Sequence, residues 1–239
     1  MLSYPVTNEP AGMLEEFGPS LYKVDGTTVS FLGFPYPTRM AVAKLSDDST
    51  WIWSPVALTE DLAGAVDAIG PVRHIVSPNK IHHLFLAAWS ERWPDARLYA
   101  PPGLARKKPE LGFVAELGDE PDPTWAADID QVIFRGSLAM EEVAFFHRAS
   151  RTAIIGDLIQ RHPPSRMSGW RGLLMRLDGL VGEYGSTPRE WRASFVRRGA
   201  ARAARDKVLG WNAERLLIAH GECSRTGATA IIARSLGWI

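Results

Sequence analysis

Between Leu21 and Trp53, apolar and polar residues alternate in short runs that are rich in β-branched and aromatic side chains. The runs read LYKV, TTVSFLGF, RMAVAKL and STWIW, and the polar triplets DGT and SDD interrupt them. Alternation with period two, broken by turn residues, is typical of half-buried strands joined by short connections. The pattern therefore predicts successive antiparallel strands in this part of the chain.

The period changes after residue 58, where helical spacing takes over. Thr59 can cap a helix in which Leu62, Val66 and Ile69 recur at helical spacing, and Gly70 can end it. The pattern then predicts a strand over 73–78, a helix over 81–93, a strand over 96–102 and a short helix over 104–111. Such alternation of strand and helix is typical of a layered α/β fold.

The second half of the chain begins with an acidic stretch, expected to be a solvated loop over 113–130. Strands are predicted in DQVIFRG, EVAFFHRAS, RTAIIGDLI and ERLLIAHGE, and a last helix in GATAIIARSLGWI. Residues 162–210 interleave arginines with large apolar residues and predict a helical insertion. We expect residues 1–20 to form an N-terminal arm and residues 21–239 to form a single domain.

Composition narrows the class of protein. The 239 residues carry 27 basic and 27 acidic side chains, and this zero net charge argues against a nucleic-acid partner held by bulk positive charge. No run approaches the ~20 apolar residues of a membrane span, and the N-terminal residues show no secretory signal, so a cytoplasmic protein is expected. The single cysteine, Cys223, excludes an intrachain disulfide, and any metal site must use histidines and carboxylates.

Three predicted strands run out into polar residues that could meet at one rim of a sheet. The segments are HIVSPNKIHH (74–83), TAIIGD (152–157) and LLIAHG (216–221). Together they supply His82, His83, Asp157 and His220. Strand ends are the usual place for ligands in α/β sheets, and imidazoles with a carboxylate suit zinc, iron or manganese. The sequence thus offers a candidate site for one metal ion.

Each histidine also has a purely structural interpretation. His82 and His83 open a predicted helix, where they could bond its first turn, and Asp157 could cap the segment after its strand. His220 is more specific, because a polar ring at the end of a buried strand needs a partner. The pattern places His147 as an ordinary strand residue and predicts that His74 and His162 lie on the surface.

In this arrangement the chain resembles the metallo-β-lactamase superfamily, whose fold is a four-layered αββα sandwich with a metal site at one rim. The resemblance rests on WIWSPVAL, HIVSPNKIHHLFLAAWSERWPDARLYAPP, EVAFFHRASRTAIIGDL and LLIAHGE, and extends from Tyr22 to Ile239. These segments look like a subfamily placed in that superfamily as a domain of unknown function. The resemblance implies an α/β fold of this type with a C-terminal helical insertion.

The chain departs from the superfamily at the first metal-binding motif. Where Thr/Ser-His-x-His-x-Asp-His is expected, the aligned residues run from Ser77 to His83 as SPNKIHH. Pro78 and Lys80 stand where two imidazoles would hold the first metal, and no histidine lies near Ser137. The resemblance therefore implies a degenerate site that lacks the first metal.

Four residues could still serve the second metal position as the resemblance places it. They are His82, His83, Asp157 and His220, enough for one zinc, iron or manganese ion. In the alternative interpretation no metal binds. Lys80 then replaces the first metal electrostatically, holding an oxyanion or neutralising Asp157, and these two residues are the candidate catalytic pair.

Three functional hypotheses follow. The chain is a non-catalytic member of the fold, or it is a mononuclear metal-dependent hydrolase of a small ester, thioester or lactone. A third hypothesis uses the basic stripe at 189–207 to contact nucleic acid, anionic lipid or an acidic partner, although the stripe could equally pair with the acidic loop at 116–130 of the same chain. Of the three, the sequence favours the first, because Pro78 and Lys80 replace two ligands of the first metal.

Overall fold

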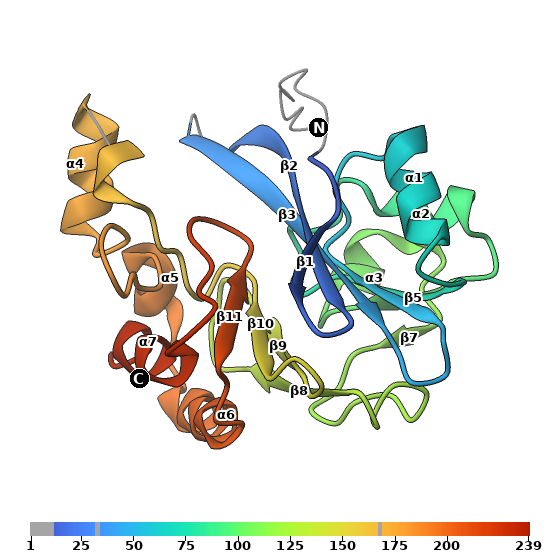
Figure 1. Ribbon diagram of the computed structural model, residues 1–239. Helices are drawn as coiled ribbons and strands as arrows, with labels where there is room; N and C mark the ends of the chain where they lie inside the picture. The colour runs from blue at the N-terminus through green and yellow to red at the C-terminus, as the bar shows by residue number, and fades with distance from the viewer. Residues whose placement is uncertain (1–11, 32–33, 167–168) are drawn as a thin grey trace. The chain divides into compact units, whose positions relative to one another are not determined.

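The computed structural model of the protein describes residues 12–31, 34–166 and 169–239. The chain divides into two compact units, Met1–Glu116 and Leu117–Ile239, called here the N-terminal and the C-terminal unit. Each unit contains one β-sheet with helices packed against it (Figure 1). A single domain spanning 21–239 stays a prediction.

The N-terminal unit contains a seven-stranded sheet in which the strands follow their order along the chain. The pairings from the first to the fourth strand are antiparallel, and those from the fourth to the seventh are parallel. The strands are β1 (Glu15–Gly18), β2 (Leu21–Phe31), β3 (Phe34–Lys44), β4 (Thr50–Trp53), β5 (Val72–Val76), β6 (Arg97–Ala100) and β7 (Ala115–Glu116). The antiparallel run predicted between Leu21 and Trp53 is confirmed, and one further strand, β1, lies within the expected N-terminal arm.

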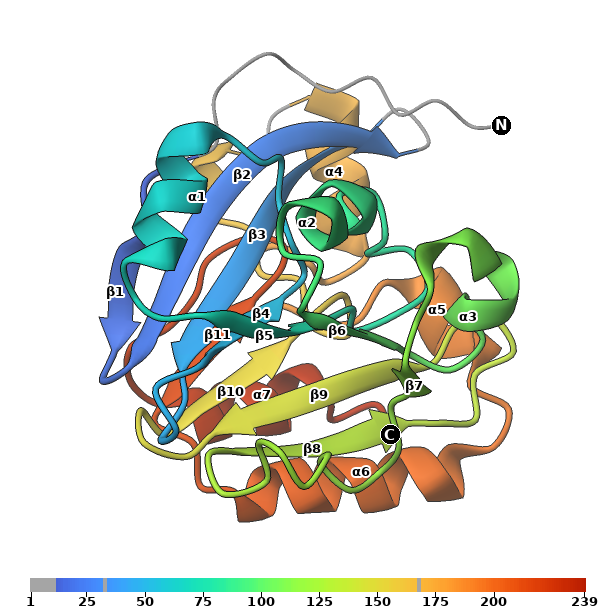
Figure 2. The same ribbon diagram turned by 90° about the vertical axis from the view of Figure 1, so that its right-hand side faces the viewer.

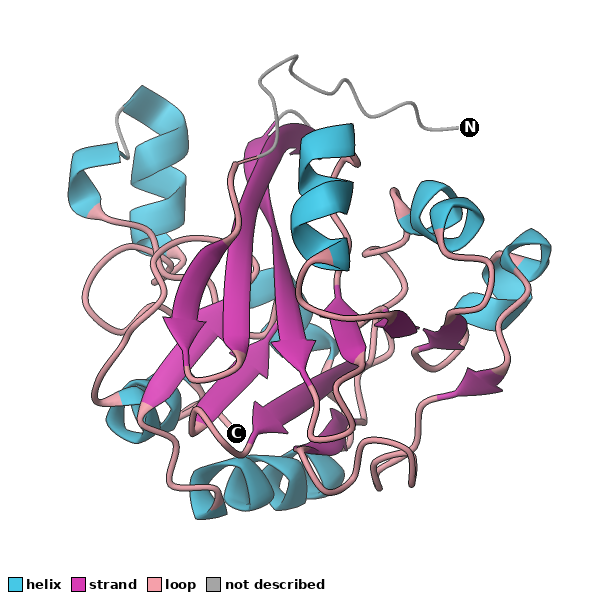
Figure 3. Ribbon diagram, turned by 45° about the vertical axis from the view of Figure 1, so that its right-hand side comes forward, coloured by secondary structure: helices cyan, strands magenta, loops and turns pink. Residues whose placement is uncertain are grey.

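Two helices cover one face of this sheet, which Figure 3 shows with strands in magenta and helices in cyan. Helix α1 (Glu60–Asp67) begins where Thr59 Oγ1 accepts the N–H of Leu62 at 3.2 Å, as the sequence predicts. Helix α2 (Leu86–Arg92) buries Trp89 against the same core. Two short helical turns, α3 (Leu104–Lys107) and η1 (Pro109–Leu111), follow β6.

The C-terminal unit contains a four-stranded sheet in the order β11-β10-β9-β8. Strands β8 (Ile129–Phe134), β9 (Glu142–His147) and β10 (Thr152–Ile155) are antiparallel neighbours, and β11 (Arg215–Ile218) joins β10 in parallel. Helices pack on one face of this sheet, and Figure 2 shows α6 running along β8. Three of the helices, α5 (Arg189–Ser194), α6 (Arg198–Gly210) and α7 (Ala228–Ser235), contribute buried residues to this core.

The predicted helical insertion at 162–210 is helical over most of its length. It contains the turn η2 (Pro164–Arg166), α4 (Gly169–Leu177), α5 and α6. Its basic stripe partly serves the chain itself, because Lys207 Nζ lies 3.3 Å from Asp130 Oδ1 and 3.9 Å from Glu120 Oε1. None of the helices in the described part of the chain is long and apolar enough to cross a membrane.

The prediction of a helix over 81–93 is wrong at its start. The helix begins at Leu86, and residues 80–85 form turns instead. Asn79 causes this delay, since its Oδ1 accepts the N–H of Ile81 at 3.0 Å and its carbonyl accepts the N–H of His82 at 3.3 Å. Short polar side chains compete with helical hydrogen bonds in this way. His82 and His83 therefore lie in a loop rather than in a helix.

Candidate metal centre

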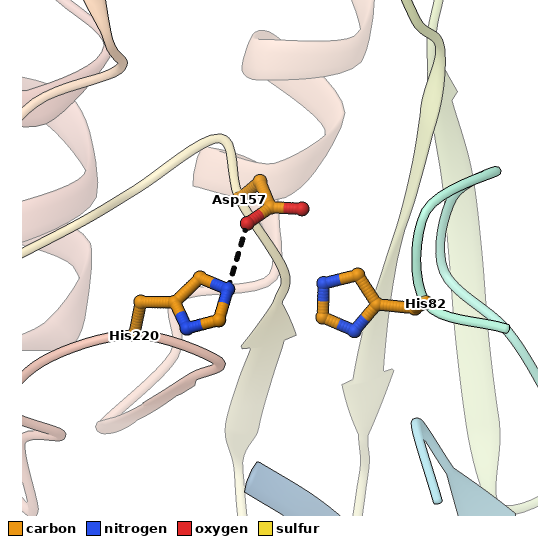
Figure 4. A group of neighbouring side chains, drawn as sticks. All are labelled: His82, Asp157 and His220. Carbon is orange, nitrogen blue, oxygen red and sulfur yellow. Dashed lines mark ion pairs between the residues drawn. The ribbon is translucent and has the colours of Figure 1, made fainter. Parts of the chain in front are cut away.

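Asp157 and His220 form the half of the candidate site that the C-terminal unit provides. Strands β10 and β11 are parallel and in register, with Ile155 opposite Ile218. Asp157 and His220 each follow the last strand residue by two positions, so the parallel pairing brings them side by side. Asp157 Oδ1 lies 3.0 Å from His220 Nε2, and both side chains are buried (Figure 4).

Glu142 holds the turn that carries Asp157. Its buried carboxylate accepts the main-chain N–H of Gly156 at 3.0 Å, of Asp157 at 2.7 Å and of Leu158 at 3.2 Å. A Cβ on Gly156 would lie 2.7 Å from Glu142 Oε2, so only glycine allows this close approach. The carboxylate of Asp157 is thus set on a turn with satisfied backbone donors.

His82 is the candidate donor of the N-terminal unit. Its Nδ1 lies 2.6 Å from the hydroxyl of Ser54, and its carbonyl accepts the hydroxyl of Ser77 at 3.0 Å. Ser54 has a φ of 51°, in the left-handed region that non-glycine residues rarely adopt. A hydrogen bond to one ring nitrogen fixes the orientation of the other, which is how proteins commonly orient metal-binding histidines. This contact therefore favours Nε2 of His82 as the ligand atom.

His83 has a different partner from its neighbour. Its Nε2 lies 3.2 Å from Lys107 Nζ, and this ammonium also donates to the carbonyl of Lys80 at 3.0 Å. Burial lowers the pKa of His83, and the charges of Lys107 and Lys108 lower it further. Burial also lowers the pKa of Lys107, with a contribution from the nearby ammonium of Lys80. His83 could bind a metal through Nε2 only after losing its contact with Lys107 Nζ.

The remaining histidines differ from the sequence interpretation in part. His74 and His162 are buried, with 4% and 5% of their surfaces exposed, so their predicted surface placement is wrong. His147 lies in β9 as predicted, and its Nδ1 lies 2.7 Å from the hydroxyl of Ser150. Burial lowers the pKa values of His147 and His162 to about 4 in each case.

Sequence reasoning missed the two residues that orient the donors, Glu142 and Ser54. A signal existed for Glu142, because it opens a strand whose other residues are largely apolar, where a charge needs several partners. No comparable signal marks Ser54, since its left-handed conformation depends on the packing around the end of β4.

Comparison with known families agrees with the fold. The profile of a domain of unknown function, DUF4336, matches residues 28–168, which is more than half of the chain. The chain belongs to this family. No curated protein sequence matches the DUF4336 chain.

Solved structures similar to this DUF4336 chain include many metallo-β-lactamases. The enzyme DIM-1 is 13% identical, with a TM-score of 0.63 over 99% of this chain and 98% of that one. A metallo-β-lactamase from Hirschia baltica is 13% identical, with a TM-score of 0.62 over 96% and 98% of the two chains. FIM-1 from Pseudomonas aeruginosa, solved in a mono-zinc form, is 13% identical, with a TM-score of 0.59 over 95% and 94%. The predicted α/β fold class of the metallo-β-lactamase type is confirmed.

Proposed function

We propose that the protein holds one metal ion through His82, Asp157 and His220 and acts as a single-metal hydrolase on a small ester, thioester or lactone. The observation that carries the proposal is the pairing of Asp157 Oδ1 with His220 Nε2 at 3.0 Å. Two ligand atoms of a tetrahedral zinc ion lie about 3.3 Å apart, given bond lengths of about 2.0 Å. The pair in the C-terminal unit thus has a separation suited to two ligands of one ion.

The third donor in this proposal is His82, one of the two adjacent histidines that the sequence resemblance assigns to the second metal position. Its bond to Ser54 favours it over His83, whose Nε2 is engaged by Lys107. A metal held there would act as a Lewis acid and make hydroxide available at neutral pH. The mono-zinc form of FIM-1 is a precedent for one zinc ion in this fold.

Residues of this chain would perform the remaining steps. In the proposal, the second carboxylate oxygen of Asp157 accepts a proton from the attacking water. By the sequence resemblance Lys80 replaces a ligand of the superfamily's first metal, and in the proposal its ammonium would hold the developing oxyanion. Glu142 and Ser54 contact no reacting atom and act by orienting Asp157 and His82.

A non-catalytic role is the second candidate, and the same ion pair favours it. Asp157 and His220 already satisfy each other without a metal, and Pro78 and Lys80 cannot ligate the first one. In this case Lys80 would only balance the charge of Asp157, and the site would be a remnant.

Chelator-dependent unfolding separates the two candidates. Protein purified without added metal or chelator should contain close to one equivalent of metal by elemental analysis, and a strong chelator should lower its melting temperature, because metal binding free energy stabilises the fold. His220→Ala should abolish both the metal and the chelator effect. His147→Ala is the matched control, since it removes another buried histidine and should leave the chelator effect intact. If the wild type contains no metal and the chelator does not change its melting temperature, the metal proposal is wrong and the non-catalytic role is supported.

If metal is present, a panel of chromogenic short-chain esters, thioesters and lactones tests the hydrolase activity directly. We expect Lys80→Met to reduce turnover while the metal content stays unchanged. Full metal content without turnover on any member of the panel would contradict the hydrolase proposal and keep only the metal site.

A further inference from the structure

Residues 160–162 form an extended segment that lies between two other segments of the C-terminal unit. On one side Gln160 exchanges two backbone hydrogen bonds with Ser186, and His162 bonds the backbone around Val181. On the other side Arg161 pairs in parallel with Gly221. These contacts give 160–162 the backbone geometry of a central strand.

This geometry decides which side chains share a face. Successive side chains in an extended strand point to opposite faces, and residues paired across a bridge share one face. Arg161 and Gly221 therefore share one face, and Gln160 and His162 share the other. The main-chain N–H of Arg161 donates to the carbonyl of His220 at 3.4 Å, so the segment lies directly beside the backbone of His220.

Two glycines allow the close approach that this placement needs. A Cβ on Gly221 would lie 2.1 Å from the carbonyl oxygen of Arg161, and one on Gly185 would lie 2.2 Å from that of Gln160. Both glycines have a positive φ. The segment is thus held tightly from both sides, and its side chains have little freedom to turn elsewhere.

Two polar atoms on the shared face have no protein partner. Within the described residues, Nε2 of His162 and Oε1 of Gln160 are buried and make no hydrogen bond. The exposed fractions of these residues are 5% and 3%. Buried polar groups almost always have a partner, so two such atoms beside His220 point to a group that binds there.

We propose that His162 and Gln160 recognise a hydroxyl group of the small molecule that binds at Asp157 and His220. A hydroxyl both donates and accepts, so it can donate to Oε1 of Gln160 and accept the N–H of a neutral His162. The inference rests on the proposed metal site and narrows its ligand to a hydroxylated small molecule.

Matched pairs of carboxylates test this inference with the full-length zinc-loaded protein. Lactate and propionate differ by one hydroxyl, as do 3-hydroxybutyrate and butyrate. In the wild type we expect the hydroxylated member of at least one pair to bind about tenfold more tightly by calorimetry, the effect of about one net hydrogen bond. His162→Phe should reduce this ratio to about one while its zinc content and its affinity for the unsubstituted acid stay unchanged. Gln160→Met should reduce the ratio as well.

His147→Phe is the matched control, because it removes a buried neutral histidine of the same unit and should keep the ratio. If His162→Phe does not fold, NMR spectra of the histidine ring nitrogens in the wild type replace this variant. The chemical shift of Nε2 of His162 should then change on addition of the hydroxylated acid and stay the same with the unsubstituted acid. Equal affinities within both pairs would overturn the inference and leave a buried water as the partner of the two atoms. A preference that survives His162→Phe, or loss of zinc from that variant, would overturn it too.

Zinc binding by the wild type is measured separately, so failure of the metal site is distinguishable. If the wild type binds no zinc, the proposed function fails, and the same titrations are run on the metal-free protein. A hydroxyl preference there that depends on His162 would sustain the inference, and its absence would overturn it.

Discussion

The carboxylate of Glu142 accepts the main-chain N–H of Asp157 at 2.7 Å, and it accepts the N–H groups on either side as well. A buried carboxylate that receives three backbone donors is well compensated for its lost hydration. The turn after β10 therefore keeps one conformation, and Asp157 meets His220 in the position that the parallel strands β10 and β11 define.

Replacement of Glu142 should affect both stability and metal binding. Glu142→Gln keeps the shape but turns an amide N–H₂ toward backbone donors, so we expect a loss of about 1–3 kcal/mol in the free energy of unfolding. Metal affinity should fall about 10–100-fold, as for other residues that orient ligands. Urea denaturation and zinc competition measure the two effects. The neighbouring Glu141→Gln is the control, and equal behaviour of the two variants would contradict this role of Glu142.

The two adjacent histidines should differ in their effect on metal content. His82→Ala should lose the metal, because His82 is the proposed ligand that Ser54 orients. His83→Ala should keep it, because Nε2 of His83 contacts Lys107 instead. Elemental analysis of the two purified variants gives the answer. The reverse result would make His83 the ligand.

Ser54 provides a test that separates backbone strain from ligand orientation. Ser54→Gly should relieve the left-handed conformation but lose the hydrogen bond to His82, so metal affinity should fall about 10–100-fold without a comparable loss of stability. Ser20→Gly is the matched control, since Ser20 is exposed and has a φ of 56°. It should leave zinc affinity unchanged. If the two variants bind zinc with equal affinity, Ser54 does not orient a metal ligand.

His147 should make the protein sensitive to acid. Its pKa is about 4 in the folded protein and about 6.5 in an unfolded chain, so the unfolded chain binds the proton first as the pH falls. The stability present above pH 6.5 is therefore lost progressively toward pH 4, and His147 alone accounts for about 2 kcal/mol between pH 8 and pH 5. Chemical denaturation at several pH values measures this. The free energy of unfolding of His147→Gln should fall less between pH 8 and pH 5 than that of the wild type, by the same amount of about 2 kcal/mol. If the free energies of the two proteins fall in parallel with pH, the acid sensitivity belongs to other groups.

Local patterns in the sequence determined the elements of the fold well. The alternation between Leu21 and Trp53 predicted β2, β3 and β4, and Thr59 with its helical spacing predicted α1. The pairing of Asp157 with His220 also follows from the sequence once their strands are taken as parallel neighbours, because both residues sit two positions beyond a strand end. These features depend on periodicity and capping, which nearby residues specify.

Tertiary structure alone decided the partners of the polar side chains. Asn79 delays the start of the expected helix to Leu86 and leaves His82 and His83 in a loop. There His82 contacts Ser54 and His83 contacts Lys107. His162 reads as a surface residue in the sequence, yet its segment is enclosed between two others and its ring is buried. Such contacts join residues far apart along the chain, and their geometry depends on packing that no local pattern encodes.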